Sequence, residues 1–123
     1  MPRGLPAHSL AVVDRVEEAL RRLALNDEGS VGSALAIGSG EEARSALDPK
    51  SRALVRLGAL VSIGATTSSY RWTVELAYRA GASDDEILGV LSAVAPAAGL
   101  ARVVSASPSL ALAMGYDVAE DLT

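Results

Sequence analysis

Three hydroxyl-bearing side chains have a spacing that can bring them together on one helix. Thr66, Ser69 and Thr73 stand at positions i, i+3 and i+7 of a segment that is predicted to be helical, so they fall on one face. Such a row would line a pocket and orient a polar ligand through hydrogen bonds, which makes these three the candidate catalytic residues. The alternative is that the hydroxyls bond to their own backbone, with Thr66 or Thr67 capping the helix.

A lone arginine is the second feature with chemical potential. Arg102 is the only charged residue between Ile87 and Tyr116, and burial of an unpaired guanidinium is very costly. A planar guanidinium can bind a substrate carboxylate through two hydrogen bonds. Alternatively, Arg102 pairs with an acid of its own or a neighbouring subunit, or reaches solvent. The weaker candidates for the same binding role are Arg52, Arg56 and Arg71.

Two aromatic residues flank Arg71 on the same segment. Tyr70 and Trp72 either pack in the core or line a ligand cavity, and Trp72 is a candidate substrate-binding residue. Glu75 is placed on the surface, although it would serve as an acid or base if it were buried.

Several other chemistries lack the residues that they need. The chain has no cysteine and a single histidine, His8, so disulfides, thiolate chemistry and a Ser-His-Asp site are excluded within one chain. A transition-metal site within one subunit lacks ligands. The Gly38-Ser39-Gly40 segment lacks the spacing of a phosphate-binding loop. We therefore expect no metal and no cofactor.

Composition favours one globular domain over residues 1–123. Half of the residues are hydrophobic and the formal net charge is −4, without the basic stripe that nucleic-acid binders usually carry. No stretch reaches the roughly 20 apolar residues needed to span a bilayer, and the N-terminus lacks an apolar signal core. We expect a cytoplasmic protein that binds neither nucleic acid nor membrane.

The hydrophobic periodicity and the capping signals predict an all-α helical bundle. The first predicted helix runs from a Ser9 cap to a stop at 26–29, the second from an Asp48 cap to about Ile63, and the third over Thr67–Ala80. The fourth runs from a Ser83 cap to about Ala95, and Pro96 kinks or ends it. A further helical segment is predicted near Ala97–Ser105, and Pro108 begins or bends a last helix that reaches Met114. Residues 1–7 are predicted to be loose and 117–123 to form an acidic tail. Whether residues 30–46 cover a pocket is left open.

Charge depletion in the C-terminal half points to assembly. Leu57–Tyr70 carries no charge, which a helix tolerates when it is buried nearly all round. Ile87–Tyr116 carries only Arg102, and one small helical domain cannot hide every face of so much apolar helix. We therefore predict a homo-oligomer with this half in the interface.

The segment Leu47–Gly99 resembles the carboxymuconolactone decarboxylase family, which includes the alkylhydroperoxidase D-like proteins. The matching features are LDPKSR at the start of the long helix, the pair Arg71-Trp72, the junction AGASDDEI and the turn APAAG. This resemblance implies an all-α fold and a trimer or hexamer.

The sequence departs from that family at the reactive positions. The peroxidase branch carries Cys-x-x-Cys-x-x-x-His, and the matching positions here are Thr66, Ser69 and Thr73; the family's usual glutamate after the LDPKxR arginine is Ala53. A hydroxyl cannot form a disulfide or reduce a peroxide as a thiolate does. The departures therefore imply a protein without thiol peroxidase chemistry.

Two functions remain open. The first is a decarboxylase or lyase-type enzyme that acts on, or at least binds, a small carboxylated lactone-like molecule, held by arginine and hydroxyl groups. The second is a non-catalytic oligomeric binding or scaffold relative whose ancestral active site is lost. A third option is complementation, in which a partner subunit supplies the missing groups.

Overall fold

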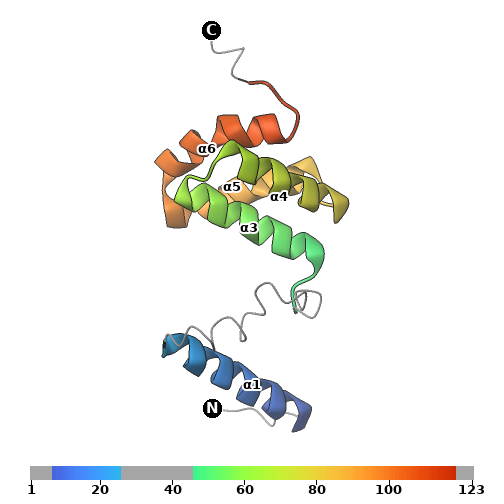
Figure 1. Cartoon of the computed structure of the whole chain (residues 1–123), viewed down its shortest axis with the longest axis vertical. Coiled ribbons are helices and arrows are strands. Elements are labelled where there is room, and N and C mark those ends of the chain that lie inside the picture. The colour runs from blue at the N-terminus through green and yellow to red at the C-terminus, as the bar shows by residue number, and fades with distance from the viewer. Residues whose placement is uncertain (1–6, 26–45, 119–123) are drawn as a thin grey trace. The chain divides into compact units, whose positions relative to one another are not determined.

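The computed structural model describes residues 7–25 and 46–118 of the chain (Figure 1). Within these ranges the structure is helical and holds no strand, which confirms the predicted all-α class. The helices are α1 (Ala7–Ala24), α3 (Pro49–Ile63), α4 (Thr67–Arg79), α5 (Asp84–Ala98) and α6 (Leu100–Ala113). The chain divides into two compact units, residues 1–45 and residues 46–123. The single domain over 1–123 stays a prediction.

Helix α1 begins earlier than its predicted cap. Its first residue is Ala7, so Ser9 lies inside the first turn, and its prediction as the N-cap is wrong. A serine inside a helix costs only a few tenths of a kcal/mol relative to alanine, too little to stop α1 from starting before it. Of the N-terminal segment predicted to be loose, Ala7 is helical, and residues 1–6 lie outside the described residues.

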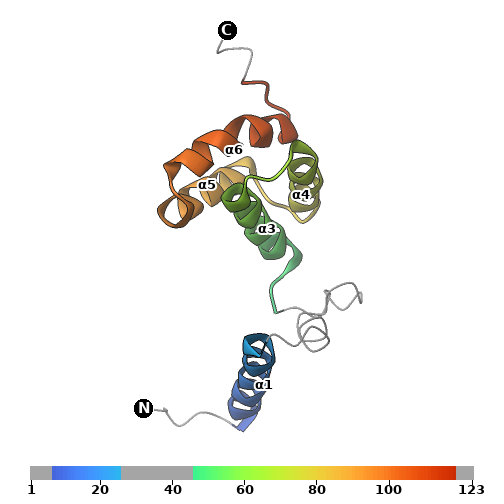
Figure 2. The same cartoon turned by 60° about the vertical axis from the view of Figure 1, so that its left-hand side comes forward.

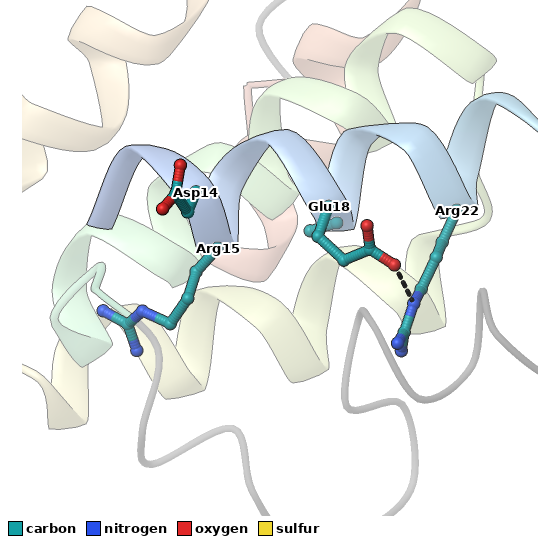
Figure 3. A pocket seen from close by; sticks show the side chains of 5 residues that line it. Asp14, Arg15, Glu18 and Arg22 are labelled. Atoms are coloured by element: carbon teal, nitrogen blue, oxygen red, sulfur yellow. Dashed lines mark hydrogen bonds and ion pairs between the residues drawn. The ribbon is translucent and has the colours of Figure 1, made fainter. Parts of the chain in front are cut away.

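The polar face of α1 carries ion pairs between residues four positions apart. Arg21 contacts Glu17 at 3.2 Å and Arg22 contacts Glu18 at 3.1 Å, and Figure 3 shows the second pair beside a cavity that α1 residues line. Both pairs are exposed, so each contributes a few tenths of a kcal/mol at most. The apolar stripe opposite is also exposed by half or more in the residues Val13, Val16 and Leu20.

Helix α3 has the start and stop that its sequence predicts. The Asp48 side chain accepts a hydrogen bond from the Ser51 backbone N–H at 2.7 Å, and Pro49 occupies the first helical position. This bond is the main reason that the pKa of the Asp48 carboxyl falls below its usual value. The helix ends at Gly64, whose φ of 69° lies in the left-handed region that favours glycine.

The buried side of α3 is narrower than expected. Only Ala53, Leu57 and Val61 are buried along the helix, at four-residue spacing, whereas Ile63 is 71% exposed. The prediction that the uncharged stretch is buried nearly all round is therefore wrong within this chain. The reason is geometric: among the described residues of the second unit, α4, α5 and α6 contact α3 (Figure 2), and these contacts bury only residues at four-residue spacing.

The core of the second unit lies between α3, α4, α5 and α6. Its largest fully buried side chain is Tyr70, whose hydroxyl donates to the backbone oxygen of Leu60 at 3.1 Å. The interpretation of Tyr70 as a packing residue is confirmed, and burial raises the pKa of its phenol. The buried hydrophobic residues are Ala53, Leu57, Val61, Tyr70, Val74, Ala77, Ala82, Ile87, Val90, Ala106 and Leu110.

Helix α5 begins at the predicted Ser83 cap, which forms a capping box with Glu86. The Ser83 hydroxyl accepts from the Glu86 backbone N–H at 3.1 Å, and the Glu86 carboxylate accepts from the Ser83 N–H at 3.0 Å. Glu86 also pairs with Lys50 at 2.9 Å, which joins the first turns of α3 and α5. The pair with Lys50, followed by the bond from Ser83, lowers the pKa of the Glu86 carboxyl.

The two prolines in the C-terminal half lie inside helices. Pro96 belongs to α5, which continues to Ala98, and Pro108 belongs to the single helix α6. Of the predicted alternatives, those in which Pro96 ends α5 near Ala95 and Pro108 begins a separate helix are wrong, and a sixth segment near 97–105 is not separate from the one predicted at 108–114. A proline removes one backbone hydrogen bond, and in α6 the Ser107 hydroxyl donates to the Val103 oxygen at 2.7 Å beside that gap.

Two tyrosines converge on one carboxylate at the start of α5. Tyr78 donates to Oδ1 of Asp84 at 2.6 Å, and Tyr116, which follows α6, donates to Oδ2 at 2.7 Å. These two bonds lower the pKa of the Asp84 carboxyl. Burial, followed by the bond to Asp84, raises the pKa of Tyr78 to about 12. The cluster ties the end of α6 to the α4–α5 junction.

Removal of the Tyr78 hydroxyl should change how stability depends on alkaline pH. The folded-state pKa of Tyr78 lies above the ordinary 10.0, so its contribution to stability is full below pH 10 and is lost as the pH rises towards 12. The free energy of unfolding of the native chain should therefore fall across this window more than that of Tyr78→Phe. Urea unfolding of both proteins at each pH measures the difference, and parallel pH curves would contradict it.

Substitution of Gly64 should destabilise the α3–α4 corner. A Cβ on Gly64 would lie 2.9 Å from Nη1 of Arg102, and the left-handed φ is unfavourable for alanine. We expect Gly64→Ala to lower the free energy of unfolding by about 1–2 kcal/mol. The control is Gly89→Ala inside α5, where a Cβ meets nothing within 4 Å, and it should raise stability by about 0.5–1 kcal/mol. Urea unfolding of both variants would contradict this if they shifted in the same direction.

Candidate functional site

The corner between α3 and α4 positions the first of the predicted hydroxyl groups. Thr66 occupies the N-cap position of α4 through its backbone, but its side chain makes no capping bond. Its Oγ1 instead lies 3.1 Å from Oγ of Ser68 and 3.3 Å from Oγ of Ser69. The next hydroxyl, that of Thr67, donates to Ser109 on α6 at 3.2 Å. Thr66 is thus bonded to its neighbouring hydroxyls, and side-chain capping is not its role.

A cavity of about 330 Å³ lies beside this corner, between α3 and α4. Among the described residues it is lined by Arg56, Ala59, Leu60, Ser69, Trp72 and Thr73. Ser69 and Thr73 stand one turn apart on α4 and so face the same side. We call this cavity the α3–α4 pocket.

The wall of the α3–α4 pocket combines a buried hydroxyl and an exposed indole. Thr73 is only 4% exposed, whereas Trp72 is 62% exposed. Ala59 and Leu60 supply the apolar surface from α3. The described residues contain no buried side-chain nitrogen or oxygen without a hydrogen-bond partner. The site therefore offers an accessible flat surface next to a buried threonine.

Every polar side chain that lines the pocket among the described residues can donate a hydrogen bond. Arg56 and the Trp72 indole are donors only, while Ser69 and Thr73 can donate or accept. No carboxylate lies among these lining residues. Such an inventory suits a ligand that carries acceptor oxygens and a negative charge, as a carboxylate does.

The two arginines favoured by the sequence lie elsewhere. Arg71 is exposed on α4, and Arg102 is exposed on α6 with its guanidinium beside Gly64. Neither is among the residues that line the α3–α4 pocket. At the Gly64 corner the Arg102 cation stands near the C-terminal end of α3, where the helix dipole favours positive charge.

Glu75 lies on the surface, as predicted. It is exposed on α4 and forms an ion pair with Arg79 one turn later. It is not among the residues that line the pocket. Within the described ranges, no cluster of three histidine, cysteine, aspartate or glutamate side chains is placed to hold a metal ion.

Arg56 lines the α3–α4 pocket, although the sequence offers it only as a weaker candidate than Arg102. It lies on α3 one turn before Leu60, and Leu60 lies one turn before the corner at Gly64. Where two helices pack against each other across a tight corner, residues one and two turns before the corner face residues one and two turns after it. This spacing in the sequence could have indicated that Arg56 and Leu60 on α3 lie opposite Ser69 and Thr73 on α4. Of residues 30–46, whose relation to the pocket the sequence left open, 30–45 lie outside the described residues.

Comparison with known proteins identifies the family. The family model described as "Carboxymuconolactone decarboxylase family" matches residues 33–111, well over half of the chain, and includes the segment on which the resemblance rested. A comparison with curated proteins and with solved structures found no match. None of the helices in the described ranges combines the length and apolar character that a membrane span requires. Most of the match falls in the all-helical unit that carries the α3–α4 pocket. The chain therefore belongs to the carboxymuconolactone decarboxylase family.

Proposed function

We propose that this protein binds a small carboxylated, lactone-like molecule in the α3–α4 pocket. The observation that carries the proposal is the lining itself: Ser69, Trp72 and Thr73 meet Arg56 in one cavity, and each polar group there can donate to an oxyanion. Thr66 belongs to the site through its contact with Ser69. Arg71 and Arg102 remain candidate ligand contacts only for a ligand that extends beyond the lining.

The proposed activity does not include thiol peroxidase chemistry. The chain contains no cysteine, and a serine or threonine hydroxyl does not cycle through a disulfide. A peroxide-consumption assay with a thiol reductant should therefore show no rate above the uncatalysed reaction.

Binding has stronger support than turnover. The pocket lining among the described residues offers arginine, hydroxyl and indole groups, none of which is an effective general acid or base near neutral pH. An enzyme of the decarboxylase or lyase type would need a proton-transfer group from outside these described lining residues. We therefore favour a non-catalytic binding protein of this family, and a lyase is the second candidate function.

We also propose that the protein is a homo-oligomer, as a trimer or hexamer. Four large apolar side chains of α5 and α6 are exposed by two fifths or more in the single chain, and they are Leu88, Leu100, Val104 and Leu112. Arg102 is the one charged residue in the two helices after the first turn of α5. A surface of this kind is typical of contacts between subunits, and the same surface is present on every copy.

Ligand binding can be tested with the protein's own fluorophore. Trp72 is the only tryptophan of the chain and lines the pocket, so its fluorescence should respond to a bound ligand. We expect at least one member of a panel of carboxylated lactones, muconate-like diacids and hydroxy acids to change the emission. The same ligand should stabilise the fold by about 2.7 kcal/mol at a hundredfold excess over Kd.

Two variants give that experiment its controls. Thr73→Val keeps the side-chain shape but removes a hydroxyl of the pocket, so it should weaken the response. Thr67→Val removes a hydroxyl that contacts Ser109 outside the pocket, so it should leave Kd unchanged. If no panel member altered either emission or melting temperature, the binding proposal would be rejected in favour of a scaffold role.

A further inference from the structure

We infer that the α3–α4 pocket binds a flat ring through one neutral oxygen, a hydroxyl or a carbonyl, which forms a hydrogen bond with Thr73. This inference rests on the proposed function, because it names the ligand atom that the same site recognises. It assigns the recognition to Thr73 and not to Ser69, the other hydroxyl that lines the pocket among the described residues.

The first step is that the Thr73 hydroxyl is unused within the part of the chain that the structure describes. Thr73 is only 4% exposed, yet its hydroxyl makes no hydrogen bond there. In the same ranges, no buried side-chain oxygen lacks a partner. The Thr73 oxygen is therefore not one of the buried atoms. It belongs to the small accessible part of this residue, which lines the cavity.

The second step separates Thr73 from Ser69. The Ser69 hydroxyl lies 3.3 Å from Oγ1 of Thr66, which also lies 3.1 Å from Oγ of Ser68. A hydroxyl has one proton to donate and two lone pairs to accept, so this cluster takes up part of the capacity of Ser69. The Thr73 hydroxyl, one turn further along α4, keeps its donor and its acceptors. A ligand oxygen therefore gains more at Thr73 than at Ser69.

The third step is the surface around this hydroxyl. Ala59 and Leu60 line the pocket from α3, and the Trp72 indole is 62% exposed beside it. Flat rings stack on an indole in offset or edge-to-face arrangements. At about 330 Å³ the cavity is at the small end of ligand pockets, which suits a single ring. An unpaired hydroxyl in such a wall discriminates against a ring that offers it no hydrogen bond.

The experiment compares rings of similar size that differ in one group: phenol with a hydroxyl, 4-pyrone with a ring carbonyl, and toluene with a methyl. Each is titrated into the native chain and into Thr73→Val, with Trp72 fluorescence as the signal. We expect Kd for phenol and 4-pyrone to rise about three- to tenfold in the variant, as for the loss of one neutral hydrogen bond. Kd for toluene should not rise. The same change for all probes would overturn the inference.

The two oxygen-bearing probes distinguish the direction of the hydrogen bond. The 4-pyrone carbonyl can only accept, whereas the phenol hydroxyl can donate or accept. A rise in Kd for 4-pyrone, with or without phenol, supports the inference with Thr73 as the donor. A rise for phenol alone supports it with Thr73 as the acceptor.

The stability of the ligand-free variants tests whether the hydroxyl has a structural role instead. Because the Thr73 hydroxyl has no partner among the described residues, Thr73→Val should leave the melting temperature unchanged or raise it. The matched control is Thr67→Val, which removes a hydroxyl that donates to Ser109. It should lower the melting temperature and leave Kd for phenol unchanged. A lower melting temperature for Thr73→Val, without a selective loss of phenol and 4-pyrone, would refute the inference.

Two further variants assign the effect to one hydroxyl. Thr73→Ser keeps the hydroxyl and should retain the preference for phenol over toluene that Thr73→Val reduces. Ser69→Ala should raise Kd for phenol less than Thr73→Val does. A larger effect of Ser69→Ala would show that the recognition was assigned to the wrong residue.

The two proposals fail in different ways. If the carboxylated compounds of the ligand panel bind but Thr73→Val does not separate phenol and 4-pyrone from toluene, the pocket binds ligands and the inference about Thr73 is wrong. If neither set of compounds changes the emission or the melting temperature, both proposals are wrong. Circular dichroism of each variant confirms that a lost response does not come from unfolding.

Discussion

A Thr66→Cys/Ser69→Cys variant is expected to form an intramolecular disulfide under mild oxidation. The two hydroxyl oxygens lie 3.3 Å apart, so sulfur atoms on the same carbons start close to bonding distance. Both positions are at the N-terminal end of α4, where the helix dipole lowers a thiol pKa below its ordinary 8.5 or so. With oxidised glutathione, the two cysteine thiols become one disulfide and two glutathione thiols are released.

The measurement is a thiol titration with mass spectrometry after incubation with oxidised glutathione. The double variant should lose both titratable thiols and two hydrogens of mass, with no glutathione attached. The negative control is Thr66→Cys/Thr73→Cys, whose residues are seven apart on the helix, about 10 Å, which is too far for a bridge. A double variant that kept both thiols or ended as a glutathione adduct would show that this corner does not have the geometry of a dithiol site.

The expected closure of this pair also bears on the history of the site. The resemblance places the reactive cysteines of related peroxidases at Thr66 and Ser69, and the structure keeps the two side chains in contact. A corner that still accepts a disulfide would mean that side chains changed while the backbone did not. Hydroxyls at these two positions would then form a hydrogen-bonding wall, which is the role that the proposed function gives them.

The ends of helices could be predicted because they depend on neighbouring residues. Asp48 with Pro49 and Ser83 with Glu86 are signals within four residues of each other, and both caps form as expected. The effects of Pro96 and Pro108 were harder to predict, because a proline removes one backbone hydrogen bond but does not always end the helix. Whether the chain continues past it depends on packing against other helices, which the local sequence does not contain. The prediction of Ser9 as an N-cap was wrong for a related reason, since a residue that caps helices well is also tolerated inside a helix.

The candidate site was predicted on one helix and missed on the other. Ser69, Trp72 and Thr73 lie within a five-residue stretch of α4, and the structure brings them to one cavity. Arg56 comes from α3, and its place in the pocket depends on how two helices pack. Arg102 stood out because it is isolated in sequence, but isolation in sequence says nothing about which cavity a side chain reaches. A lining formed by two helices therefore needs the tertiary structure.

Substitution of one residue on α6 should separate the proposed oligomer into single chains. Leu100 and Val104 stand one turn apart on the same face of α6 and are 72% and 69% exposed. If this face is covered by a second copy, Val104→Asp places a carboxylate in an apolar contact without a partner, at a cost of several kcal/mol. Each 1.4 kcal/mol weakens association about tenfold, so assembly should shift by about two orders of magnitude or more.

Sedimentation equilibrium of the native chain and the variant measures this shift. The native protein should have a multiple of the 12.6 kDa chain mass, and Val104→Asp should approach the single-chain mass at the same concentration. The matched control is Ser105→Asp, which adds the same charge at an exposed position about 100° around the helix. Since α6 keeps its buried contacts through Ala106 and Leu110, both variants should remain helical by circular dichroism. A native protein that already sediments as one chain at micromolar concentration would refute the oligomer.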